Sequence, residues 1–220
     1  MTDMTADDPG APVFFLSYSR PKRPLTVGPP REPNHVINLF DELSELVDEL
    51  IGSPVGGQPG YLDVGRGGGE IWQRAVLEAA GTCQVLVCLV SNRFLYQSIW
   101  CPREWDVFSR RKVVPRGGPR PHSETAIIPV LWTPVDIDTL PEPIARVNLF
   151  QPTGLPPEHL TRYMQEGLLG LLHTDQIAIY KSIVWKLALH IRSIHSRYHV
   201  EPGIPESIEG LRTSFTEGTP

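Results

Sequence analysis

A tryptophan and a glutamate four residues apart, Trp100 and Glu104, are the strongest candidates for chemistry in this chain of 220 residues. Residues with this spacing lie on the same face of a helix, so the indole and the carboxylate can be close together. An indole offers a surface for stacking, and a carboxylate beside it can accept hydrogen bonds from sugar hydroxyls. The pair therefore predicts a site for an aromatic base and the ribose attached to it.

Glu104 also has a purely structural interpretation. Pro102 suits the first position of a helix, because the N–H that proline lacks would be unpaired there. This assignment puts Glu104 in the first helical turn, where a carboxylate is favoured by the helix dipole and by capping without any function. Trp100, taken alone, fits a core position equally well. The spacing by itself leaves both interpretations open.

Three loops are expected to bring further polar side chains to the same place. Each follows a short apolar segment of the kind that forms a strand buried on both faces of a parallel sheet. Ligands of such sheets bind outside the carboxyl ends of the strands. The side chains that we expect to gather there are Ser17, Tyr18, Ser19, Arg20, Asp63, Ser91 and Trp100, together with Glu104.

The elements that position these loops alternate along the chain. The pattern predicts strands at residues 12–18, 61–64, 84–90 and 125–132, with a short fifth strand at 146–150. It predicts helices over residues 36–50, 70–80, 98–111 and 176–198. Alternation of this kind indicates an α/β fold, with a parallel sheet of about five strands and helices on both faces. Pro129 favours an edge or a bulge for the fourth strand.

The composition predicts a single domain with a tail at each end. Residues 1–11 are polar and expected to be disordered, residues 12–200 form the domain, and residues 201–220 resemble a flexible tail. The net charge of −5 and pI near 5.8 argue against a nucleic-acid partner. No apolar run reaches the roughly 20 residues of a membrane helix, and no signal peptide is evident. An odd count of three cysteines fits a reducing compartment, so we expect a cytoplasmic protein.

Other motifs are weaker. The glycine run at residues 65–69 lacks the Lys-Ser/Thr of a phosphate-binding P-loop. His195 and His199 have a spacing that metal ligands can have, but neither a glutamate between them nor a third ligand is evident. Ser17 has no recognisable histidine and aspartate partners for a hydrolase triad. No metal and no bound cofactor are expected.

Three segments together resemble TIR domains over roughly residues 12–198. Residues 14–20, Phe-Phe-Leu-Ser-Tyr-Ser-Arg, are similar to the first TIR box, and Asp63 with the glycine run and Trp72 is similar to the BB loop and its following helix. Ser98-x-x-Cys101-x-x-Glu104 resembles the third-helix motif of TIR domains that cleave NAD+. The end of the fourth strand, Val-Leu-Trp-Thr-Pro at residues 130–134, and the Gly-Leu-Leu at residues 167–169 that leads to the last helix resemble actinobacterial TIR-like proteins of the FxsC type. Leu62 before Asp63 departs from the arginine common in the family, and no proline occurs between Asp63 and Glu70.

The resemblance implies a flavodoxin-like five-stranded sheet in the order 2-1-3-4-5. It also implies an NAD+ glycohydrolase or cyclase that releases nicotinamide, with NAD+ as substrate, in bacterial signalling or defence. In such an enzyme Glu104 is expected to be the catalytic residue, and the side chains gathered around it are expected to bind the substrate. The expected partners are other TIR domains, met by self-association. The alternative is a non-catalytic interaction module that acts through the loop at residues 63–69, which four additional glycines make more flexible than usual.

Overall fold

A four-stranded parallel sheet is the centre of the molecule. The computed structural model describes residues 11–20, 34–52, 57, 59–64, 69–117 and 125–216. In this part of the chain the sheet has the order β2-β1-β3-β5, and all three pairings are parallel. The strands are β1 (Phe14–Ser17), β2 (Gly60–Leu62), β3 (Val85–Val90) and β5 (Ile127–Leu131). This confirms the prediction of an α/β fold with a parallel sheet.

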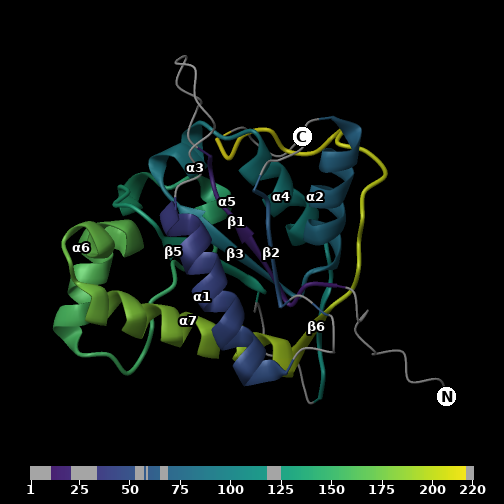
Figure 1. The fold of residues 1–220 in the computed structure, drawn as a ribbon. Helices are drawn as coiled ribbons and strands as arrows, with labels where there is room; N and C mark the ends of the chain where they lie inside the picture. Colours follow the sequence, from purple (N-terminus) through teal and green to yellow (C-terminus); the bar gives the residue numbers. More distant parts are fainter. Residues whose placement is uncertain are drawn as a thin grey trace.

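Helices cover both faces of this sheet. From β1 the chain reaches β2 through α1 (Asn34–Ile51), and it then returns past β1 to β3 through α2 (Glu70–Thr82). Because such crossovers are right-handed and these two run in opposite directions along the sheet, α1 and α2 lie on opposite faces. The helix α1 packs on α7 (Ile177–Arg197), and α2 packs on α4 (Trp100–Ser109). Figure 1 shows α1 and α7 crossing in front of the strands.

The remaining elements are short, apart from α6. They are α3 (Asn92–Tyr96), the 3₁₀ helix Ile137–Thr139, α5 (Glu142–Ala145), α6 (Pro157–His173), and the antiparallel pair β4 (Val113–Pro115) and β6 (Tyr198–Val200). None of the helices in the described part of the chain has both the length and the apolar character needed to cross a membrane.

The predicted fifth strand is wrong, because the outer edge of β5 is covered in another way. Pro129 has no N–H to offer a further strand. The N–H of Leu131 donates to the hydroxyl of Tyr163 on α6 at 2.9 Å, and the N–H of Phe150 donates to the carbonyl of Pro129 at 2.7 Å. Residues 146–150 therefore pass this edge without forming a strand, and β5 is an edge strand, as Pro129 indicates.

The helix α6 was not among the predicted elements, because glycines at positions 167 and 170 interrupt its sequence pattern. Gly167 has a φ of 66° inside it, which makes a kink that glycine adopts readily. A Cβ at this position would lie 2.6 Å from the carbonyl oxygen of Trp132, and the next residues continue the contact, since Leu169 N–H donates to that oxygen at 2.9 Å. The kink thus fixes α6 against the carboxyl end of β5.

The C-terminal segment differs from the flexible tail predicted for residues 201–220. Residues 201–216 pass over α2 and α4, as the yellow trace in Figure 1 shows. Leu211 and Phe215 are buried, and the ring of Phe215 stacks on Phe94 at 5.3 Å between centroids. The packed part of the chain therefore extends at least to Phe215, beyond the predicted boundary at residue 200. Residues 1–10, most of the first predicted tail, lie outside the described residues.

Candidate functional site

A cavity of about 210 Å³ lies at the carboxyl ends of β1 and β2, beside the start of α2 and the segment that joins α3 to α4. We call it the Glu104 cavity. Its lining residues are Phe15, Leu16, Tyr18, Ser19, Arg20, Asp63, Trp72, Gln97, Ser98, Ile99, Trp100 and Glu104. Six of them are residues that the sequence predicted for the site.

Glu104 lies in the second turn of α4, so its predicted place in the first turn is wrong. The helix begins at Trp100, two residues before Pro102, because the Ser98 hydroxyl accepts the N–H groups of Trp100 at 3.2 Å and Cys101 at 3.1 Å. The Ser98 side chain thus caps the N-terminus of α4. A capping role does not explain Glu104, whose side chain is directed into the protein and is 5% exposed.

The carboxyl group of Glu104 accepts a hydrogen bond from the neighbouring strand. The hydroxyl of Ser17, at the end of β1, donates to Oε2 of Glu104. Burial raises the pKa of Glu104 to about 7, the hydrogen bond from Ser17 opposes the rise, the charge of Asp63 adds to it, and Arg20 opposes it. A carboxyl group with this pKa is present in both its acid and its ionised form at neutral pH.

Cys101 adjoins this hydrogen-bonded pair on the inner side of α4. Burial raises the pKa of its thiol well above the ordinary value, and the negative charge of Glu104 adds to the rise. The thiol is therefore neutral at physiological pH and unsuited to act as a nucleophile. Of the three side chains in this buried group, the Glu104 carboxyl group is the one that lines the cavity, and the Ser17 hydroxyl is its hydrogen-bond donor.

Two indoles make one wall of the cavity. The rings of Trp72 and Trp100 meet edge to face, with their centroids 4.6 Å apart and their planes at 68°. Arg20 lies over Trp72 at 5.6 Å from the ring centroid, and Arg103 lies over Trp100 at 4.9 Å. Both rings are partly exposed. These contacts hold two aromatic surfaces beside the Glu104 carboxyl group.

An ion pair ties together the ends of β1, β2 and the start of α2. The guanidinium of Arg20 contacts the Asp63 carboxylate and donates to the Asp63 carbonyl at 2.9 Å. The indole N–H of Trp72 donates to Oδ1 of Asp63 at 2.8 Å. Asp63 therefore orients both a cation and an aromatic ring at the cavity mouth. The adjoining residues 65–68, which include three of the glycines predicted to make this loop flexible, lie outside the described residues.

Two predicted site residues do not line the Glu104 cavity: Ser17, which is hydrogen-bonded to Glu104, and Ser91. The Ser91 hydroxyl accepts the N–H of Phe94 at 3.1 Å and caps α3. Ser91 instead lines a neighbouring cavity of about 340 Å³, which shares Tyr18 and Ser19 with the Glu104 cavity.

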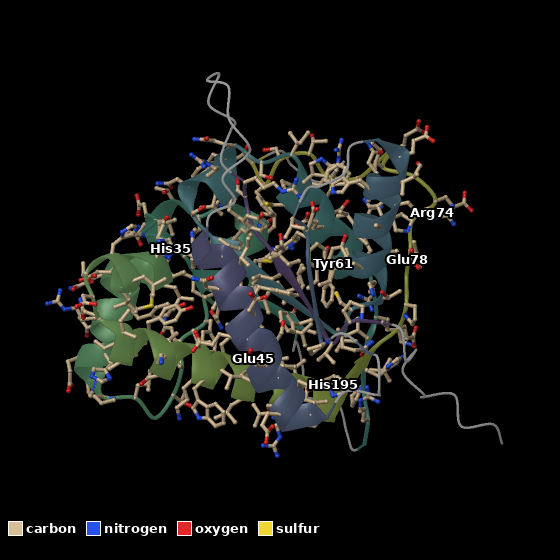
Figure 2. The ribbon with its side chains drawn as sticks, in the orientation of Figure 1. His35, Glu45, Tyr61, Arg74, Glu78 and His195 are labelled. Carbon is tan, nitrogen blue, oxygen red and sulfur yellow. The ribbon has the colours of Figure 1, made fainter. Side chains whose placement is uncertain are left out.

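The sequence did not identify several of the lining residues as part of the site. Trp72 is the main one, and its place three residues after the glycine run was the available signal. Gln97 and Ile99 belong to the segment between α3 and α4 and line the cavity from there. Tyr61 of β2, labelled in Figure 2, is close to the site without lining the cavity; burial together with the charges of Asp63 and Glu104 raises its pKa to about 12.

Among the residues that the structure describes, no three histidine, cysteine, aspartate or glutamate side chains are grouped as a metal site. The chain matches no protein-family model, no curated protein and no solved structure with which it was compared. Its function is therefore inferred from the side chains that line the Glu104 cavity.

Proposed function

We propose that this chain is a TIR-type enzyme that cleaves the bond between nicotinamide and ribose in NAD+, with Glu104 as its catalytic residue. The observation that carries the proposal is a buried carboxyl group, hydrogen-bonded by Ser17, at the bottom of a cavity with two indoles in its wall. The cavity lies at the carboxyl end of a parallel sheet, where ligands of such folds bind. The observed strand order also agrees with the first four strands of the order that the TIR resemblance implies.

A single carboxylate is sufficient for this chemistry. When the nicotinamide–ribose bond breaks, the electron pair of the bond leaves with the ring nitrogen, and the ribosyl carbon becomes an oxocarbenium-like cation. The leaving group departs as neutral nicotinamide, so no general acid is needed. The ionised form of Glu104 stabilises the cation and accepts hydrogen bonds from the ribose hydroxyls. Water then attacks the cation and loses a proton, which gives ADP-ribose; attack by a nitrogen of the adenine gives a cyclic isomer.

The other side chains of the cavity suit the parts of this substrate. The indoles of Trp72 and Trp100 offer stacking surfaces for the pyridinium ring, whose positive charge is attracted to an aromatic face. A positive charge next to Glu104 also favours the ionised form of a carboxyl group whose pKa is about 7. Binding of the substrate would thus generate the form of Glu104 that the reaction needs. Asp63 and Arg20 hold the mouth of the cavity in shape.

The test is nicotinamide release from NAD+ by concentrated protein, followed by chromatography. We expect Glu104→Gln to lower the rate by at least roughly a hundredfold, since it removes the charge that stabilises the transition state. The matched control is Glu78→Gln, a change of the same kind on the outer side of α2 (Figure 2). A folded Glu104→Gln protein with the turnover of the wild type would rule out this role for Glu104.

A non-catalytic interaction module is the second candidate, and the exposed side chain of Ile71 favours it. Ile71 lies next to Trp72 at the start of α2 and is 89% exposed, the largest exposed fraction among the large apolar residues that the structure describes. Such a residue suits a contact between copies of the chain. Self-association without any nicotinamide release, at all protein concentrations tested, would favour this function over the enzyme.

A further inference from the structure

The cavity next to the Glu104 cavity has no role in the cleavage chemistry, and we call it the Arg93 cavity. It has a volume of about 340 Å³ and lies where β1, β3 and β5 end. Its lining residues are Tyr18, Ser19, Val36, Leu89, Ser91, Asn92, Arg93, Trp132, Thr133 and Leu169. Tyr18 and Ser19 line both cavities, so the two cavities adjoin across the residues that follow β1.

The topology of the sheet explains why two cavities meet at this point. The chain passes from β1 to β2 on one side and from β2 to β3 on the other, so the crossovers diverge at β1. Open crevices at such a switch point are where doubly wound folds bind their ligands. Sites for drug-sized ligands have volumes of about 300–1,000 Å³, so the Glu104 cavity of about 210 Å³ is too small to hold a whole dinucleotide.

The charges of the two cavities differ. Arg93 is the charged residue of the Arg93 cavity, and no carboxylate lines it, whereas Asp63 and Glu104 line the neighbouring cavity. The hydroxyl groups of Ser19 and Thr133 add hydrogen-bond donors. An exposed guanidinium beside hydroxyl groups suits a phosphate, because arginine can donate two parallel hydrogen bonds to its oxygens.

The Arg93 cavity also contains aromatic and aliphatic surface. Trp132 and Tyr18 each keep 9% of their surface exposed, and Val36, Leu89 and Leu169 contribute apolar side chains. Aromatic and apolar side chains of this kind bind the flat faces of bases. The combination of one cation, several hydroxyl groups and aromatic surface matches a nucleoside diphosphate.

We infer that the Arg93 cavity binds the nucleoside diphosphate half of the dinucleotide whose nicotinamide riboside half enters the Glu104 cavity. The inference rests on the proposed function, because that function supplies the dinucleotide. Arg93 contacts the phosphates, the base lies against Trp132, and the chain of the substrate crosses Ser19 between the two cavities. Both halves of the substrate are then held by one copy of the chain.

Binding of ADP, measured by calorimetry, tests this assignment without any catalysis. We expect ADP to bind the wild type and the Glu104→Gln protein equally well. Arg93→Ala should weaken the binding about tenfold, since it removes a charge-assisted contact. The matched control is Arg192→Ala, which removes an exposed arginine of α7. Thr133→Phe, which fills the cavity from another element, should weaken binding as well. No binding of ADP, or equal binding by the Arg93→Ala and Arg192→Ala proteins, would overturn the assignment.

Steady-state kinetics of NAD+ cleavage distinguish a failure of this inference from a failure of the proposed function. In NAD+ cleavage, Arg93→Ala should raise KM about tenfold and leave kcat within about twofold, because Arg93 does not contact the reacting bond. If nicotinamide is released and the KM of the Arg93→Ala protein is unchanged, the assignment of the Arg93 cavity fails and the reaction stands. If no nicotinamide is released but ADP binding still depends on Arg93, the reaction fails and the nucleotide site stands.

Discussion

The side chain of Glu104 affects the stability of the fold as well as the proposed reaction, because burial makes its ionised form unfavourable. Its pKa is raised from 4.5 to about 7, so the folded protein holds a proton that the unfolded chain has already lost in this range. The stabilisation by the neutral form is complete below pH 4.5 and is lost as the pH rises through about 7. Each pKa unit corresponds to about 1.4 kcal/mol, which gives a loss of about 3 kcal/mol.

We therefore predict that Glu104→Gln weakens the pH dependence of stability. The free energy of unfolding of the wild type should fall by about 3 kcal/mol more between pH 4.5 and pH 8 than that of the Glu104→Gln protein. Urea denaturation at several pH values measures both, and Glu78→Gln again serves as the control. Parallel curves for the wild type and the Glu104→Gln protein would show that Glu104 is not perturbed.

Trp100 should affect substrate binding more than folding. The ring is partly exposed at the cavity and lies between Trp72 and Arg103, so its removal leaves little buried space. We predict that Trp100→Ala raises the KM for NAD+ about tenfold, the typical cost of losing one aromatic stacking partner. Trp185→Ala, on α7 and 42% exposed, is the control. Unchanged kinetics together with a large drop in melting temperature would instead make Trp100 a core residue.

The sequence identified much of the Glu104 cavity because strand ends are easily recognised. Tyr18, Arg20 and Asp63 follow short apolar strands, and parallel strands bring such residues to one edge of a sheet. Trp72 was missed as part of the wall, since the orientation of a residue at the start of α2 depends on the preceding turn. Ser91 was expected to bind substrate because it follows β3, but the sequence does not reveal that its hydroxyl caps α3.

At the scale of elements, the contact between α6 and β5 supplies a direct test of the fold. Tyr163 is fully buried, and its hydroxyl is the acceptor for the N–H of Leu131. We predict that Tyr163→Phe lowers the free energy of unfolding by about 1–3 kcal/mol, because a buried N–H loses its partner. Tyr96→Phe removes the same kind of hydroxyl from an exposed site and should cost less than about 0.5 kcal/mol. Equal effects of the two changes would contradict the role of Tyr163.

The sequence predicted those elements whose apolar residues recur with a clear helical or strand periodicity. In α1, Val36, Leu39, Leu43 and Val47 recur every three or four residues, and all are buried. The sequence of α6 has no such clear pattern, because its shape depends on the kink at Gly167 and on contacts with β5. The segment around Phe215 has the composition of a polar tail, yet Leu211 and Phe215 are buried, and the Phe215 ring packs between Phe94 and Trp105. The structures of α6 and of the segment around Phe215 both depend on contacts with residues far away in the sequence, which a local pattern does not reveal.

At the scale of the whole molecule, the TIR resemblance predicts activity that depends on assembly. Ile71 and Ile99 are exposed near the mouth of the Glu104 cavity, so an association that covers them would also enclose the substrate. We predict that the rate per mole of protein rises with concentration over a roughly hundredfold range, since mass action favours the assembled form. Sedimentation measured at the same concentrations should show that the protein associates over the range in which its rate per mole rises.

Substitution of the exposed isoleucines separates assembly from catalysis. Ile71→Ser should shift the concentration dependence to higher protein concentration, whereas Ile177→Ser, an exposed position on α7, should leave it unchanged. A constant rate per mole from a protein that stays monomeric would contradict the assembly requirement.

The covered edge of β5 has a consequence for how this protein behaves at high concentration. An open strand edge is a template on which other chains can add strands, and such growth leads to fibrils and aggregates. An added strand would need the outward N–H and carbonyl groups of β5. Pro129 has no N–H, its carbonyl accepts the N–H of Phe150, and the N–H of Leu131 donates to the Tyr163 hydroxyl. At the opposite edge of the described sheet, β2 is three residues long, which gives a very short template. Self-association through helices and loops can therefore occur without addition of strands at the β5 edge of the sheet.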